Sequence, residues 1–102
     1  MKDRLELLRQ ILAERPGDTL ARYGLAMEHL KAGRAEEAVA EFRTLIAANP
    51  GYTYAYYHAG QALEKLGRTG EARAMYDAGL AHATDAHSRS ELQAALDLLP
   101  ED

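Results

Sequence analysis

The chain has 102 residues, no cysteine and a formal net charge of −4, which excludes disulfides and thiolate metal sites and suits a single domain. Its Arg and Glu side chains are interspersed, with no basic stripe that would indicate a nucleic-acid partner. The first residues lack the apolar core of a signal peptide, and no apolar run approaches the about 20 residues of a membrane helix. We therefore expect a cytoplasmic protein with no membrane partner.

The first predicted helix covers residues 3–15. Asp3 and Glu6 have the spacing of a capping pair, in which each side chain satisfies an otherwise unpaired backbone N–H. Pro16 and Gly17 end the helix. The helix is apolar on two adjacent stripes, which are Leu5, Leu8 and Leu12, and Leu7 and Ile11.

Two more helices are predicted at 19–32 and 35–48. Asp18 is suited to cap the first of them, and Gly33 supplies the left-handed residue that closes it at little steric cost. The second stops at Asn49, which precedes a proline and a glycine. Their apolar faces contain Leu25, Ala26, Leu30, Ala38, Val39, Phe42, Leu45 and Ile46.

The same plan then repeats, with a helix predicted at 53–66 that ends at Gly67 and another at 70–83. A sixth helix starts somewhere from residue 85 to 89, because two capping signals occur there: the pair Thr84-Asp85, and an S-x-x-E capping box of Ser88 and Glu91. Leu92, Leu96 and Leu99 form its apolar stripe, and Pro100 marks its end. Since no segment alternates with period two, we predict an all-α protein of about six antiparallel helices.

Residues 19–52 and 53–86 are two copies of a 34-residue unit. Ten positions are identical at this offset, more than unrelated segments of this Ala-rich composition share. A fixed period of this length indicates one supersecondary unit stacked on itself. The identical pairs are Thr19/Thr53, Ala21/Ala55, Tyr23/Tyr57, Lys31/Lys65, Gly33/Gly67, Arg34/Arg68, Glu37/Glu71, Ala38/Ala72, Ala40/Ala74 and Ala47/Ala81.

The unit resembles the tetratricopeptide repeat (TPR), whose pattern is W-x2-L-G-x2-Y, then A-x3-F, then a closing proline. The first copy has Ala38 and Phe42 as A-x3-F and Pro50 as the proline, and the second has Ala72 and Tyr76. The copies depart from the pattern at the tryptophan, the tyrosine and the second proline, positions that vary within the family. The departures are Arg22, Tyr56, His29, Leu63 and Thr84.

The resemblance implies a right-handed superhelix of helix pairs that binds a peptide or partner protein on its concave face, which is lined by the first helix of each pair. It also implies half-units at 1–18 and 87–102, the latter as a C-terminal capping helix. The matching concave-face residues are Leu20, Tyr23, Met27, Leu30, Tyr54, Tyr57, His58 and Gln61, with Lys31 and Lys65 at the groove edge.

This concave face is predicted to be aromatic and apolar. Family members that grip a terminal carboxylate use Lys, Arg and Asn there, whereas Tyr23 takes a clamp position and the only Asn, Asn49, lies at a turn. Such a face suits an extended apolar segment or an amphipathic helix. Two alternatives stay open: the tyrosines only pack against neighbouring helices, as expected for Tyr56, or the final helix fills the groove.

The terminal half-units suggest a second function, self-assembly into an oligomer. The first helix has two apolar stripes and would be buried on both sides if the final helix of another chain completed it. Closed symmetry would give a dimer, and open head-to-tail stacking would give filaments. The alternative is that Leu7 and Ile11 are only partly covered in a monomer.

No catalytic motif is present, so we expect neither an enzyme nor a cofactor. His82, Asp85 and His87 lie near one another around a turn, but their spacing matches no metal site. His29 is expected to be packed with a local hydrogen bond. His58, on the concave face, is expected to contribute to recognition or to titrate near neutral pH.

Overall fold

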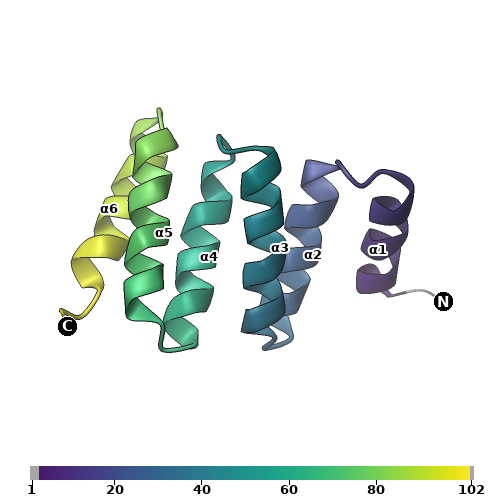
Figure 1. The fold of residues 1–102 in the computed structure, drawn as a ribbon, viewed down its shortest axis with the longest axis horizontal. Helices are drawn as coiled ribbons and strands as arrows, with labels where there is room; N and C mark the ends of the chain where they lie inside the picture. The colour runs from purple at the N-terminus through teal and green to yellow at the C-terminus, as the bar shows by residue number, and fades with distance from the viewer. Residues whose placement is uncertain (1–2, 102) are drawn as a thin grey trace.

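The computed structural model describes residues 3–101, which form six α-helices standing side by side in chain order (Figure 1). The described part of the chain contains no strand, as predicted, and measures 45 × 28 × 19 Å. None of its helices is long and apolar enough to cross a membrane. The helices are α1 (Arg4–Glu14), α2 (Thr19–Lys31), α3 (Ala35–Ala48), α4 (Thr53–Lys65), α5 (Thr69–His82) and α6 (Ala86–Leu98).

Three of the helix starts are fixed by aspartate caps. The carboxylates of Asp3, Asp18 and Asp85 each accept a hydrogen bond of 2.9 Å from the backbone N–H three residues later, which satisfies one unpaired donor at each helix start. The turns that follow α2 and α4 contain Gly33 and Gly67, whose φ angles of +80° and +74° favour glycine. Both glycine stops were predicted from the sequence.

The predicted capping box of Ser88 and Glu91 is wrong. Asp85 caps the helix instead, because its Oδ2 already accepts the backbone N–H of Ser88. The helix therefore begins at Ala86, and Ser88 lies buried within its first turn. Glu91 is then one turn further along, where it pairs with His87 on the helix surface.

The main core lies between consecutive helices from α2 to α6. Ala38 and Ala72 have no exposed surface, and neither have the aromatic side chains that follow them, Phe42 and Tyr76. Small residues let the helices approach closely, and the rings fill the space between helix pairs. These positions therefore have the packing role that the repeat pattern predicts.

The helices at the two ends of the molecule are packed differently. At one end, α1 forms a separate small cluster with α2, in which Leu8 and Leu12 are buried while Leu7 remains 48% exposed. At the other end, α6 packs against α5 and also against α4. The final helix thus extends the layer that contains α4 and does not fill the predicted groove.

Candidate functional site

The face formed by α2, α4 and α6 contains a hollow of about 500 Å³, which we call the aromatic pocket. Its walls come from three helices and from the segment that precedes α4, so it exists only when the repeats are stacked. The lining side chains are Tyr23, Tyr52, Tyr54, Tyr57, His58, His87 and Glu91.

Tyr23 is at the centre of the aromatic contacts. Its ring centroid lies 5.3 Å from that of Tyr52 and 5.9 Å from that of His58, with tilted planes in both pairs. Tyr57 approaches His58 edge-on, at 5.4 Å. Tilted and edge-on contacts are the favourable geometries for aromatic pairs, so the rings hold one another in place at the wall of the pocket.

The pocket is electrically neutral to negative. Burial lowers the pKa of His58, an effect that nearby Glu91 partly opposes, so the imidazole is mainly uncharged at neutral pH. Burial raises the pKa of Tyr23, and the hydroxyls of Tyr52 and Tyr54 nearby raise it further, which keeps this phenol protonated. Among the described residues, no Lys or Arg lines the pocket.

Of the residues that the structure describes, Glu91 is the one that brings a carboxylate to the pocket wall. Its Oε1 lies 3.4 Å from Nε2 of His87, which is a cation only when protonated. The Glu91 side chain keeps 42% of its surface exposed, so it remains available to a ligand. Tyr54, at 50% exposure, is the most open of the four tyrosines.

The structure divides the ten predicted groove residues among several places. Tyr23, Tyr54, Tyr57 and His58 meet in the aromatic pocket. Leu20 and Met27, together with Tyr23, line a second hollow next to α1. Leu30 and Lys65 line a third hollow at the Gly33 turn, while Lys31 is exposed, with its Nζ 3.8 Å from a carboxylate oxygen of Glu28. Gln61 is half-buried, near the hydroxyl of Tyr76.

The second hollow, of about 540 Å³, is the α1–α2 groove. Leu8 and Ile11 contribute from α1, and Leu20, Gly24 and Met27 from α2. Leu20 is 72% exposed, an unusual exposure for a side chain of this size. The groove is therefore an open, largely apolar surface, with Arg4, Arg15 and Asp18 also in its lining. Its helix α1 lies at the end of the molecule opposite α6 (Figure 1).

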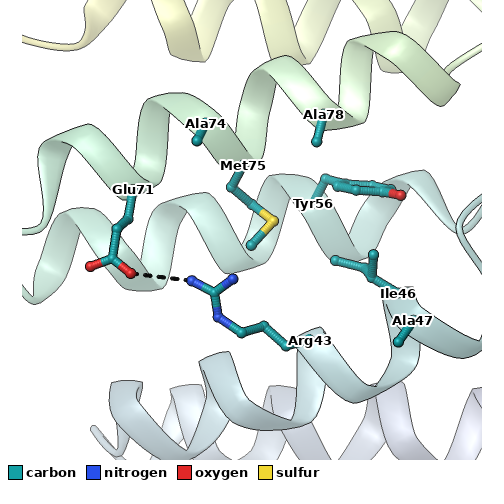
Figure 2. Close-up of a pocket in the computed structure, with 8 residues that line it drawn as sticks. All are labelled: Arg43, Ile46, Ala47, Tyr56, Glu71, Ala74, Met75 and Ala78. Atoms are coloured by element: carbon teal, nitrogen blue, oxygen red, sulfur yellow. Dashed lines mark hydrogen bonds and ion pairs between the residues drawn. The ribbon is translucent and has the colours of Figure 1, made fainter.

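A further hollow of about 500 Å³, which we call the α3–α5 hollow, lies among α3, α4 and α5. Figure 2 shows Arg43 reaching from α3 toward Glu71 of α5, with the sulfur of Met75 beside it. The Arg43 guanidinium and the Glu71 carboxylate approach to 3.3 Å. Behind this ion pair the lining is mostly aliphatic, and the hydroxyl of Tyr56 is occupied by a 2.6 Å hydrogen bond that it donates to the Pro50 carbonyl.

Two histidines have structural roles. His29 is 5% exposed and accepts a 3.0 Å hydrogen bond on Nδ1 from the Arg34 side chain, which confirms the predicted packed imidazole. His82 stacks on the buried ring of Tyr56, with centroids 5.7 Å apart. In the part of the chain that the structure describes, no three His, Asp or Glu side chains gather as a metal site.

The family model of the tetratricopeptide repeat matches residues 5–51 and 29–99. This chain belongs to the tetratricopeptide repeat family. A tetratricopeptide repeat domain protein from Salinibacter ruber is 40% identical in its solution structure, with a TM-score of 0.74, covering 79% of this chain and 85% of that one. No curated protein is similar enough in sequence to match.

More distant solved structures share the fold over most of the chain. A protein from Bordetella parapertussis is 27% identical, with a TM-score of 0.81, covering 95% of this chain and 87% of that one. A variant of MamA is 24% identical, with a TM-score of 0.72 over 90% of this chain and 52% of that one. The likeness to MamA concerns the fold alone.

Three residues that line the aromatic pocket of this TPR protein were not predicted as site residues from the sequence: Tyr52, His87 and Glu91. Tyr52 precedes its helix, and a loop residue has no helical face from which to predict its direction. Glu91 could have been found, because it follows Tyr57 by the same 34 residues that separate Tyr57 from Tyr23. Extending the repeat register into the last helix would have placed it on the same face.

Proposed function

We propose that this TPR protein is a non-catalytic interaction module, an adaptor or scaffold that binds a peptide or partner protein at the aromatic pocket on the α2–α4–α6 face. The observation that carries the proposal is the convergence of four tyrosines from different repeat positions on one hollow. Tyrosine provides a large contact area at low entropic cost and is enriched in binding hot spots.

The exposed tyrosine provides the sharpest test. Tyr54 is half exposed, so Tyr54→Ala removes contact surface while the buried core stays intact. Immobilised wild-type protein and the variant are compared for the proteins they retain from the source cell, quantified by mass spectrometry. Arg43→Ala, in the α3–α5 hollow, is the control. Partners lost with Tyr54→Ala and kept with Arg43→Ala support the proposal, and equal retention by both variants contradicts it.

A second candidate function is self-association through the α1–α2 groove. It is supported by the 72% exposure of Leu20, which lines the groove, and Leu7, 48% exposed outside the groove lining, adds a second apolar side chain on α1. The outer side of α6 is mostly polar instead, with exposed Ser90, Gln93 and Asp97, and Gln93 donates a 3.0 Å hydrogen bond to Asp97. Leu98, 84% exposed, is the apolar exception at the last residue of this helix. Unlike ends favour a closed two-fold dimer, groove against groove, over head-to-tail filaments.

The dimer is tested by light scattering of the purified protein over a wide concentration range. We expect a wild-type dimer that Leu20→Glu converts to a folded monomer, because burying the added carboxylate in the dimer interface would cost its hydration. Leu98→Glu, at the 84% exposed position on α6, is the control. A wild-type monomer at all concentrations would remove this candidate.

A further inference from the structure

We infer that the aromatic pocket recognises a cation, the guanidinium of an arginine side chain in the bound protein. This inference rests on the proposed function and specifies the chemistry of the ligand. It follows from two independent features of the pocket, its wall of aromatic rings and its single carboxylate without a permanent cation.

The aromatic wall supplies the first half of the recognition. Four phenol rings and the imidazoles of His58 and His87 line the hollow, and the negative face of an aromatic ring attracts a cation within about 6 Å of its centroid. The Tyr23 and Tyr52 centroids are 5.3 Å apart, so one flat group can contact more than one ring. A guanidinium is planar and stacks on aromatic faces more readily than an ammonium does.

The carboxylate supplies the second half. Glu91 lies at the pocket wall with 42% of its side chain exposed, and His87 is the one partner with which it forms an ion pair in the described structure. No described Lys or Arg lines the hollow, so an entering guanidinium meets no permanent positive charge among the lining side chains. It can donate two parallel hydrogen bonds to the carboxylate, a geometry that an ammonium cannot reproduce.

The charge distribution along the chain points in the same direction. The last 18 residues contain five acidic side chains and one Arg, so their net charge equals the −4 of the whole chain. Helix α6 (Ala86–Leu98) belongs to this acidic segment and contributes His87 and Glu91 to the pocket wall. An anionic ligand would be repelled there, whereas a basic segment would be attracted over about the Debye length.

The other hollows formed by residues 3–101 lack this combination. In the α3–α5 hollow the one carboxylate, Glu71, already pairs with Arg43 (Figure 2). In the α1–α2 groove Arg15 lies 3.8 Å from Asp18, and the remaining lining is largely aliphatic. An aromatic wall and a carboxylate without a permanent cation occur together at the α2–α4–α6 face.

The test is an NMR titration of the 15N-labelled protein with N-acetylarginine amide, with the neutral isostere N-acetylcitrulline amide as the comparison. We expect saturable shifts at Tyr54, Tyr57, His58 and Glu91 with arginine and none with citrulline. Glu91→Gln should weaken arginine binding about threefold to tenfold. Glu14→Gln, which removes the same charge from α1 far from the pocket, should leave it unchanged. Equal shifts with both probes, or equal affinity of Glu91→Gln and wild type, would overturn the inference.

A second arm separates this inference from the proposed function. In the capture experiment, partners lost with Tyr54→Ala but fully retained by Glu91→Gln would overturn cation recognition and leave the binding face intact. Partners lost with both variants support both statements. Partners that neither variant loses would refute the binding function and the arginine assignment together.

Discussion

Replacing Gly60 by alanine tests the closest helix approach in the core. Gly60 faces the ring of Tyr76, and a Cβ built on it would lie 2.2 Å from Cε1, 2.5 Å from Cζ and 2.7 Å from Cδ1 of that ring. Tyr76 is fully buried, and its hydroxyl donates a hydrogen bond to Glu64. The ring is therefore anchored at both ends and has no free volume into which to move.

Helix propensity alone would predict that Gly60→Ala stabilises the protein, whereas we expect the substitution to destabilise it. In an unhindered helix, Gly→Ala stabilises by up to about 1 kcal/mol, whereas overpacking a close-packed core costs about 1–3 kcal/mol. We expect Gly60→Ala to destabilise by about 1–3 kcal/mol. For a chain of this size each kcal/mol corresponds to about 4–8 °C in Tm, so the loss is easily measured by thermal or urea unfolding followed by circular dichroism.

The chain provides two controls for this prediction. Gly70→Ala introduces a Cβ that meets no atom within 4 Å, so it should be neutral or stabilising. The first repeat has Ala26 and Phe42 at the equivalent positions, both fully buried, and Phe42 lacks a hydroxyl to fix its ring. The double variant Gly60→Ala/Tyr76→Phe should therefore recover part of the loss. A Gly60→Ala variant as stable as wild type would refute the packing argument.

Three further predictions concern stability. Ala38→Leu should destabilise by about 1–3 kcal/mol in thermal melts, because a fully buried methyl site cannot hold three more carbons; an unchanged Tm would contradict the core assignment. Tyr56→Phe should cost about 0.5–1.5 kcal/mol in urea unfolding, because it removes the hydrogen bond to the Pro50 carbonyl, whereas Tyr54→Phe at the half-exposed position should cost little. Because the pKa of His58 is lowered in the folded protein, the imidazole takes up a proton in the unfolded state first as the pH falls through the ordinary value of 6.5. The free energy of unfolding should therefore decrease as the pH falls below this value, and it should decrease less steeply in His58→Gln. Parallel stability curves for that variant and wild type between about pH 7 and pH 5 would contradict this assignment.

The sequence predicted the helices and their buried positions because both depend on local patterns. Gly33 and Gly67 marked helix ends, and the A-x3-aromatic step marked the interior at Ala38 and Ala72. Each of these signals lies within one repeat, where spacing along the chain translates directly into direction around a helix.

The sequence did not predict how the groove residues are divided, because that depends on which helices flank each position. Leu20 on α2 and Tyr54 on α4 occupy equivalent positions of the two repeats. Leu20 nevertheless faces the end of the stack, whereas Tyr54 faces a neighbouring unit. The start of α6 illustrates a different limit. Asp85 and Ser88 both carry capping side chains, and only the folded chain shows that the aspartate takes the backbone N–H of the serine.

The separate cluster of α1 and α2 has a consequence for local unfolding. The core of α2 to α6 is continuous, whereas α1 packs substantially against α2 alone. In a stacked array each element is stabilised by its neighbours, so an element with one neighbour opens at the lowest free energy. Hydrogen exchange should therefore be fastest in α1 and slowest near α4. Each opening of α1 would also remove one wall of the α1–α2 groove. A partner bound in the groove would therefore slow hydrogen exchange in α1.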